Sequence, residues 1–182
     1  MNYISDLKKI LRLRMLEKRK SMTKELVQSK SKVICNEVIK FLSKKSNMLE
    51  VIVAAYWPLH NEVDIKGIFP WLLNEKYKIC LPMKQQQFSL WRMGDELYNN
   101  GKFLEPCIND IINPRIVFVP LIAFDKDKNR LGYGSGFYDQ FFSNYTVVKI
   151  GVAYSWQQIS NVPIEFHDCK LDYVITEKKI FL

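Results

Sequence analysis

Three glycines at alternate positions form the part of the sequence with the clearest chemical potential. Gly132, Gly134 and Gly136 stand in the stretch 129-NRLGYGSGFYDQFF-142, which follows the apolar segment 116-IVFVPLIAF-124. Glycine loses more conformational freedom on folding than any other residue, so this spacing indicates a backbone that needs positive φ or approaches a ligand closely. A glycine-rich turn that enters a helix directs backbone N–H groups at one point, where the helix dipole also favours an anion.

Two charged residues in this stretch suit a nucleotide. Arg130 can make a bidentate contact with phosphate, and Asp139 can hold the Mg²⁺ that accompanies a nucleotide. A loop whose glycines only turn the chain under the aromatic residues is an equally good interpretation of the pattern. The spacing matches neither GxxxxGK[ST] nor GxGxxG, so neither of those phosphate-binding mechanisms can be transferred to it.

The elements that must position these residues alternate between strand and helix patterns. Apolar positions recur at helical spacing over 1–45 and predict two helices, which are broken near 20-KSMTK-24. Strands are predicted over 51–56, 78–82, 87–93, 116–124, 147–155 and 172–176, and helices over 68–75 and from 137 onward. This alternation predicts an α/β fold with a mostly parallel sheet, in a single domain over 1–182. Ligands of such folds bind beyond the carboxyl ends of strands, where the glycine stretch lies.

Composition and charge restrict the class of partner. The net charge of +8 admits nucleic acid, anionic lipid or a polyanionic small molecule, but most lysines are scattered, which is typical of a solvated surface. The densest basic cluster runs from Lys8 to Lys20. The four cysteines are far apart and form no CxxC, and the two histidines, His60 and His167, have no assigned role; this argues against a zinc site and for a reducing, cytoplasmic location. We expect neither a membrane span nor a cleaved signal peptide.

The string 130-RLGYGSGFYD-139 resembles the signature RLGxGxGYYD of the 5-formyltetrahydrofolate cyclo-ligases, also called methenyltetrahydrofolate synthetases. Three further segments occur in the order found in that family, namely 8-KKILR-12, 56-YWPLHNEVD-64 and 97-LYNNGKFLEP-106, so the resemblance extends over nearly the whole chain. It implies a three-layer α/β/α sandwich of Rossmann-like type. The implied activity is an ATP- and Mg²⁺-dependent conversion of 5-formyltetrahydrofolate into 5,10-methenyltetrahydrofolate, with release of ADP and phosphate.

The resemblance also implies residues for two substrate sites and a metal ion. Lys8 and Arg130 would act on the transferring phosphate as catalytic residues. The expected ATP contacts are Lys8, Lys9, Arg12, Arg130, Leu131, Gly132, Tyr133, Gly134, Ser135, Gly136, Phe137 and Tyr138. The expected folate contacts are Trp57, Glu62, Tyr133, Gly134, Ser135, Gly136 and Phe137. Asp139 and Asp172 would hold Mg²⁺.

The sequence departs from the family pattern at three of these positions. Many members carry a basic residue at the position of Tyr133 or Ser135, so part of the phosphate charge is expected to come from Lys8, Lys9 or Arg130. Phe137 replaces a common tyrosine and removes one hydroxyl. The three glycines and the aspartate of the signature are retained.

Purely structural roles stay open for several of the implied residues. Glu62 can be a solvated loop acid, and Trp57 can cap the core after a strand. Lys8 and Arg12 stand four residues apart and share one helix face, which can converge on a triphosphate or belong to the solvated side of a basic helix. Asp172 can be a turn residue before the last predicted strand.

Two other functions compete with the implied one. One is an ATP-dependent kinase or ligase of another small acid, in which the nucleotide half is kept and the second pocket differs. The other is a basic nucleic-acid-binding module, which predicts aromatic residues interleaved with a basic face. The aromatic residues cluster beside the glycines instead, so small molecules are the expected partners, without nucleic acid or membrane. The oligomeric state is left open, a monomer included.

Overall fold

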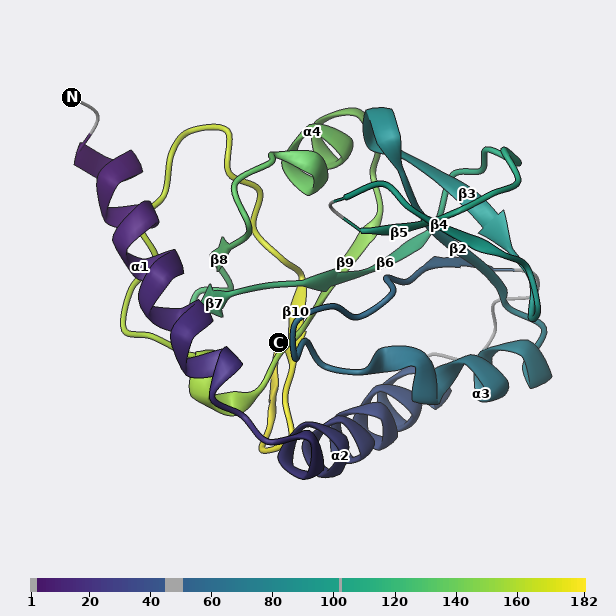
Figure 1. The fold of residues 1–182 in the computed structure, drawn as a ribbon, viewed down its shortest axis with the longest axis horizontal. Helices are drawn as coiled ribbons and strands as arrows, with labels where there is room; N and C mark the ends of the chain where they lie inside the picture. Colours follow the sequence, from purple (N-terminus) through teal and green to yellow (C-terminus); the bar gives the residue numbers. More distant parts are fainter. Residues whose placement is uncertain (1–2, 45–50, 102) are drawn as a thin grey trace.

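Seven strands form one sheet among the residues that the computed structural model describes, which are 3–44, 51–101 and 103–182 (Figure 1). Their order is β11-β10-β9-β6-β1-β2-β3. The bounds are β1 (Ile52–Ala54), β2 (Lys78–Met83), β3 (Gln87–Trp91), β6 (Ile116–Pro120), β9 (Val148–Val152), β10 (Tyr173–Ile175) and β11 (Ile180–Phe181). The five strands from β10 to β2 pair in parallel, whereas the edge strands β3 and β11 pair antiparallel. The predicted mostly parallel α/β sheet is therefore confirmed.

Helices cover both faces of this sheet, which gives the three expected layers. α2 (Lys24–Ser43), η1 (Ile65–Ile68) and α3 (Phe69–Asn74) lie on one face, and α4 (Phe137–Asn144) lies on the other (Figure 1). Thr23 caps the start of α2, because its side chain accepts a hydrogen bond from Leu26 N at 3.3 Å. Its buried stripe of Ile34, Val38 and Leu42 has helical spacing and packs on the sheet.

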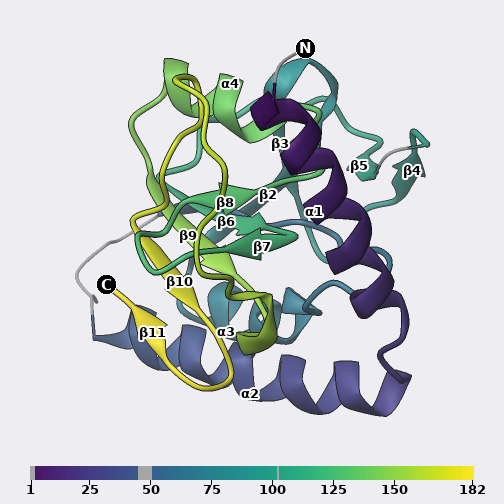
Figure 2. The same cartoon turned by 90° about the vertical axis from the view of Figure 1, so that its left-hand side faces the viewer.

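The first helix, α1 (Tyr3–Lys20), lies at one end of the sandwich rather than on a face (Figure 2). Its buried residues are Lys8, Met15 and Arg19, at spacings of seven and four that place them on one side of the helix. Met15 packs in a small core with Leu131, a residue of the hairpin formed by β7 (Ala123–Phe124) and β8 (Arg130–Leu131). Two of the three residues on the buried side are therefore cationic.

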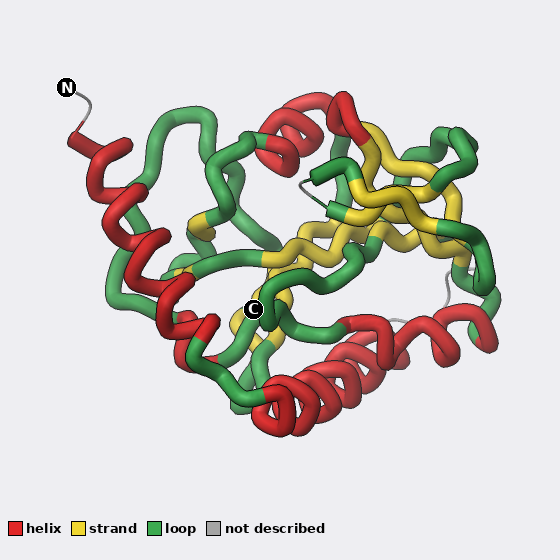
Figure 3. The backbone as a smooth tube through the Cα atoms, viewed as in Figure 1, coloured by secondary structure: helices red, strands yellow, loops and turns green. Residues whose placement is uncertain are grey.

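The β7–β8 hairpin is organised by the buried carboxylate of Asp125. One oxygen accepts hydrogen bonds from the N–H groups of Asp127 and Asn129, each at 3.0 Å. The other accepts from Asn129 Nδ2 at 2.9 Å and from Val162 N at 3.0 Å. The chain then runs through the glycine stretch into α4, which Gly136 precedes with a φ of 69°. Loops surround the end of the sheet at which the β7–β8 hairpin and the glycine stretch lie (Figure 3).

The structure differs from the sequence predictions at several strands. The predicted strand 116–124 is divided into β6 and β7, and the second belongs to a separate hairpin. The segment 97–106 forms a hairpin of β4 (Leu97–Asn99) and β5 (Leu104–Pro106) that the sequence pattern did not indicate, and its residue 102 lies outside the described residues, as do 1–2 and 45–50. Within the described chain, no helix combines the length and apolar character needed to cross a bilayer.

Candidate active site

A cavity of about 340 Å³ lies where α1, the glycine stretch and the segment around Asp168 meet. All the residues predicted to contact ATP line it, from Lys8, Lys9 and Arg12 on α1 to the continuous run Arg130–Tyr138. Pro120, at the carboxyl end of β6, also lines it, so the cavity has the position at which open α/β sheets bind ligands. Its volume is at the lower end of the range of roughly 300–1,000 Å³ for small-molecule sites.

Lys8 is buried in this wall, with 5% of its surface exposed. Its Nζ donates to Glu165 Oε2 at 2.8 Å and to Asp168 Oδ2 at 2.5 Å. Partial burial by itself raises the pKa of Asp168, but the hydrogen bonds from Lys8 and from Glu165 N outweigh it and hold this pKa below its ordinary value. The solvated-helix interpretation of Lys8 is therefore wrong, whereas Lys9 is exposed and pairs with Asp6 on the same helix.

Arg12 contacts the glycine stretch directly. Its Nε donates to Gly132 O at 2.8 Å, and its Cζ lies 3.3 Å from the point that a Cβ on Gly134 would occupy. Gly134 has a φ of +97°, a conformation that L side chains rarely adopt. The glycine is thus required both by its backbone conformation and by the close approach of the guanidinium. Burial lowers the pKa of Arg12, which the charges of Asp168 and Glu165 partly offset.

Arg130 and Asp139 form a pair beside the cavity. Arg130 Nη1 and Nη2 both donate to Asp139 Oδ1, at 3.1 and 2.9 Å, and the same oxygen accepts from Cys169 N at 2.9 Å. The Arg130 side chain is 4% exposed and that of Asp139 is 18% exposed. Arg130 Nε has no hydrogen-bond partner among the described residues. One Asp139 oxygen is therefore fully engaged.

Glu62 lies in the loop after β1 and is buried, with 7% of its surface exposed. Its Oε2 accepts from Leu59 N at 2.8 Å, and its Oε1 accepts from the hydroxyl of Tyr133 at 2.8 Å. Burial raises the pKa of Glu62 above its ordinary value, although the hydrogen bond from Leu59 N, the charge of Arg19 and the hydrogen bond from Tyr133 act in the opposite direction. A solvated loop acid is thus excluded. The contact joins the predicted folate carboxylate to the glycine stretch.

Trp57 has the packing role that the sequence left open. Its ring makes edge contacts with Phe69 at 6.5 Å and with Trp91 at 5.9 Å between centroids, and Lys66 Nζ lies 4.8 Å from its centre. It packs against the core on the α2 side, and it does not line the cavity that the glycine stretch lines. The structure thus brings Glu62, but not Trp57, into contact with the glycine stretch.

Phe137 and Tyr138 are partly buried where the glycine stretch enters α4. The Phe137 ring packs edge-on against Phe88 and against Tyr138, at 5.6 and 5.0 Å between centroids. Burial raises the pKa of Tyr138 far above its ordinary value, and the charge of Glu62 adds to this. Both residues therefore line the cavity while anchoring the helix to the core.

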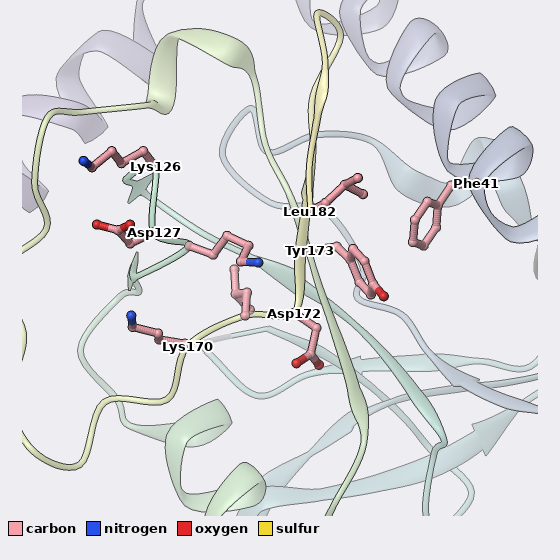
Figure 4. A pocket seen from close by; sticks show the side chains of 9 residues that line it. Phe41, Lys126, Asp127, Lys170, Asp172, Tyr173 and Leu182 are labelled. Carbon is pink, nitrogen blue, oxygen red and sulfur yellow. The ribbon is translucent and has the colours of Figure 1, made fainter.

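Asp172 lies apart from the other predicted site residues. Its Oδ2 accepts from Lys149 N at 2.7 Å, just before β10, so it stands at the amino edge of the parallel strands. Figure 4 shows its carboxylate at a wide hollow of about 870 Å³, together with Lys126, Asp127 and Lys170. Asp139 lines the other cavity, so the two aspartates predicted to share Mg²⁺ do not lie in one pocket.

The donors that face the cavity fit a divalent cation only in part. Asp139 offers a carboxylate of the hard-oxygen type that Mg²⁺ prefers, with one of its oxygens already engaged by Arg130. Ligand atoms of Glu165, His167 and Asp168 lie within 4.8 Å of one another, but the two carboxylates of this group bind Lys8. A metal role for Asp172 stays a prediction. For Asp172 and Asp139 to share one ion, the two hollows that they line would have to come together.

Three residues of this region were missed by sequence reasoning. Arg19 is 2% exposed and donates to the Tyr133 hydroxyl, and Glu165 and Asp168 bind Lys8. The sequence contained a signal for Arg19, because a spacing of eleven positions from Lys8 places both residues on the same side of a helix. Glu165 and Asp168 had none, because their contacts with Lys8 span 157 and 160 positions in the chain.

The fold and the cavity together define the class of protein to which the chain belongs. The chain is a three-layer α/β protein in which a glycine-lined cavity, with four cations and three carboxylates in its wall, opens beyond a parallel strand and adjoins a buried carboxylate. The sequence model of the 5-formyltetrahydrofolate cyclo-ligase family matches residues 4–177. The chain therefore belongs to the 5-formyltetrahydrofolate cyclo-ligase family, a family of ligases, as the signature indicated.

Individual relatives agree with this membership. A 5-formyltetrahydrofolate cyclo-ligase of Haemophilus influenzae is 34% identical over 67% of this chain, and the match spans 65% of that protein. One of Mycoplasma pneumoniae is 25% identical over 94% of this chain and 99% of its own. The solved structure of the 5,10-methenyltetrahydrofolate synthetase of Aquifex aeolicus superposes with a TM-score of 0.80 at 30% identity, covering 96% of this chain and 91% of that one.

Proposed function

We propose that this protein is an ATP- and Mg²⁺-dependent 5-formyltetrahydrofolate cyclo-ligase that forms 5,10-methenyltetrahydrofolate, ADP and phosphate. The formamide oxygen of the substrate is a poor leaving group, so N10 cannot close the ring unaided. Transfer of the γ-phosphoryl group of ATP to this oxygen releases ADP and makes the formyl carbon electrophilic. N10 then attacks that carbon and gives up its proton to solvent or to the departing phosphate, and phosphate departs with the former formyl oxygen. The enzyme's part in phosphoryl transfer is mainly positioning and charge stabilisation.

A single observation carries the proposal, namely that one segment touches both predicted substrate sites. The glycine stretch lines the cationic cavity, and its Tyr133 hydroxyl lies 2.8 Å from the buried carboxylate of Glu62. Two substrates that exchange a phosphoryl group must share a wall, and this segment has the position of such a wall.

The cations of the cavity suit the ATP phosphates. Lys8, Lys9 and Arg12 of α1 and Arg130 of β8 line the cavity together with the carboxylates of Asp139, Glu165 and Asp168. Lys8 and Arg130 are paired with these carboxylates, so the wall has a small excess of positive charge. This charge replaces the basic residue that many family members carry at the position of Tyr133. Charge placed in advance around a transferring phosphoryl group lowers the barrier most in a site that excludes water.

Glu62 suits the pterin ring. A carboxylate can accept two parallel hydrogen bonds from the N–H edge of a pterin, which fixes the orientation of the ring. Both Glu62 oxygens are paired within the protein, one with Leu59 N and one with the Tyr133 hydroxyl. Each of these oxygens has a further lone pair, so Glu62 can accept the pterin N–H edge while both internal contacts remain.

Mg²⁺ bound with ATP would neutralise part of the phosphate charge. Asp139 is the predicted ligand that faces the cavity, and its engagement with Arg130 leaves the second carboxylate oxygen for the ion. Arg130 thereby has two tasks, since it orients Asp139 and adds positive charge to the cavity wall.

The decisive experiment measures phosphate release and product absorbance together. Purified protein with MgATP is expected to release phosphate rapidly only when 5-formyltetrahydrofolate is present, with methenyl product formed in equal amount. Phosphate release without folate would identify water as the acceptor. A slow background that folate leaves unchanged would favour a kinase or ligase of another small acid, and either result contradicts the proposed function.

A further inference from the structure

Arg19 is a buried cation outside the ATP cavity. It lies in the last turn of α1, only 2% exposed, and its Nε has no hydrogen-bond partner among the described residues. Its backbone oxygen accepts a hydrogen bond from Asn61 Nδ2 at 3.2 Å, which ties this turn to the loop that carries Glu62. A buried charge is costly unless it is paired, so the group that Arg19 binds indicates what this residue does in the protein.

That partner is a chain of polar groups that ends at Glu62. Arg19 Nη2 donates to the hydroxyl of Tyr133, and this hydroxyl donates to Glu62 Oε1 at 2.8 Å. The Arg19 guanidinium carbon also lies 5.3 Å from the centre of the Tyr133 ring. Burial and the neighbouring Glu62 raise the pKa of Tyr133, so its hydroxyl keeps the proton that it donates. One cation, one neutral hydroxyl and one anion thus form a continuous chain.

We propose that Arg19 is a positioning residue of the folate site, which acts through Tyr133 and keeps the Glu62 carboxylate ionised and oriented for the donor edge of the pterin. This inference rests on the proposed function. Arg19 is assigned no contact with the reacting atoms. Its task is to hold the carboxylate in the form that accepts two hydrogen bonds, because a protonated Glu62 would present an O–H group to a ligand edge made of N–H donors.

The surroundings of Glu62 leave Arg19 as the main buried source of positive charge. Burial disfavours the carboxylate, and the exposed imidazole of His60 exerts a weaker effect than Arg19 on the Glu62 pKa. Among the described residues, Leu59 N and the Tyr133 hydroxyl bind the carboxylate, and the Tyr154 hydroxyl binds the Glu62 backbone oxygen. The neutral side chains of Tyr56 and Gln157 line a small pocket with Glu62 and Arg19. Removing the charge of Arg19 therefore removes the strongest charge that opposes the effect of burial on the Glu62 pKa, and leaves the hydrogen bond from Leu59 N in place.

The same arrangement leaves acceptor sites on Glu62 for the ligand. A carboxylate oxygen can accept two hydrogen bonds, as one oxygen of Asp125 does from two backbone N–H groups. Glu62 can therefore accept the N–H edge of a pterin while the Tyr133 hydroxyl and Arg19 stay in place.

The test compares Arg19→Gln with Arg14→Gln, which removes the same charge from an exposed position of the same helix. The KM values for 5-formyltetrahydrofolate and for ATP are measured from pH 8 to pH 6. In Arg19→Gln we expect the folate KM to rise as the pH falls, by roughly tenfold for each unit that the Glu62 pKa lies above the assay pH. The ATP KM stays unchanged, and Arg14→Gln behaves as wild type.

Arg19→Lys is the conservative variant, because it keeps the positive charge without the planar fork. We expect it to restore the flat pH profile of the folate KM, with a KM raised severalfold, and to leave the ATP KM unchanged. If Arg19→Gln does not fold, the KM values of Arg19→Lys decide whether Arg19 has the proposed role. Equal changes in both KM values, or none, would then refute the role of Arg19.

The outcomes separate the two levels of inference. A wild-type protein without folate-dependent phosphate release contradicts the proposed function. A wild-type protein that turns over, together with an Arg19→Gln variant whose folate KM does not depend on pH, contradicts the role of Arg19 alone. The carboxyl pKa of Glu62, measured by NMR in the absence of any ligand, is expected to rise in Arg19→Gln, and an unchanged value would also overturn the role.

Discussion

The three glycines of the glycine stretch can be tested separately, because each meets a different environment. An alanine Cβ at Gly134 would lie 3.3 Å from Arg12 Cζ, in a backbone conformation with φ of +97°. At Gly136 the φ is +69°, but the nearest atom is Gln140 Nε2 at an ordinary 3.8 Å. At Gly132 the φ lies outside the positive range, and no atom lies within 4 Å. The series therefore separates backbone strain from displacement of Arg12.

The expected magnitudes follow from these environments. A non-glycine residue in the left-handed region costs about 1–2 kcal/mol, so Gly134→Ala and Gly136→Ala should each lower the free energy of unfolding by that amount. For a chain of this size this corresponds to a fall in Tm of roughly 2–8 °C. Gly132→Ala should leave the Tm of the unliganded protein unchanged. Of the two strained variants, only Gly134→Ala should also weaken ATP binding through Arg12.

Thermal unfolding and ATP titration check the series. Gly136→Ala is the matched control for strain, since it has a similar conformational cost without a contact to Arg12. If the two strained variants weaken ATP binding equally, the effect comes from loop strain, and the reasoning about Arg12 is refuted. If Gly134→Ala binds ATP as wild type does, the loop has a structural role only.

Three further predictions follow from the contacts of the cavity. Asp139→Asn should abolish Mg²⁺-supported turnover and lower the unfolding free energy by roughly 3 kcal/mol, because it leaves the buried Arg130 without its anion; unchanged Mg²⁺ dependence or an unchanged denaturation midpoint would count against it. Lys8→Ala should raise the ATP KM strongly, whereas Lys9→Ala, at an exposed site, should change it little; equal effects in steady-state kinetics would contradict the assignment. The carboxylate of Asp168 has a lowered pKa in the folded state, so it stabilises the protein above about pH 4 and loses this contribution as the pH falls further; Asp168→Asn should flatten the decline of Tm with acidification, and a parallel decline would refute this.

The sequence predicted the layers of the fold because their signals are local. Helical spacing, the break near residues 20–24 and the apolar strand segments all depend on near neighbours, and α1, α2, α4 and the main strands lie where the patterns placed them. The hairpin of β4 and β5 was missed, because its strands are only three residues long and give no alternation to recognise. The division of 116–124 was missed because its apolar run continues through both strands.

The site was predictable only where one segment carries most of it. The run Arg130–Tyr138 lines the cavity as a unit, and the basic residues of α1 share a helix face. Contacts between distant segments were not visible: nothing near Lys8 in sequence indicated Asp168, and nothing near Glu62 indicated Tyr133 as its donor. The pairing of Asp139 with Asp172 rested on resemblance alone, and in the structure these residues line separate hollows.

The position of α1 connects these observations. Arg19 lies eleven positions after Lys8, which corresponds to about 16 Å along the helix and about three turns, so both cations point to the same side. The buried stripe of α2 is apolar, whereas that of α1 places only Met15 between two cations. α1 is held in place by the packing of Met15, Leu11 and Leu16 against the β7–β8 hairpin, by the partners of Lys8 near the ATP cavity and by the contact of Arg19 with Tyr133. Lys8 and Arg12 line the ATP cavity, whereas Arg19 in the last turn contacts the Tyr133 hydroxyl beside Glu62, so one helix supplies each substrate site with cations of its own.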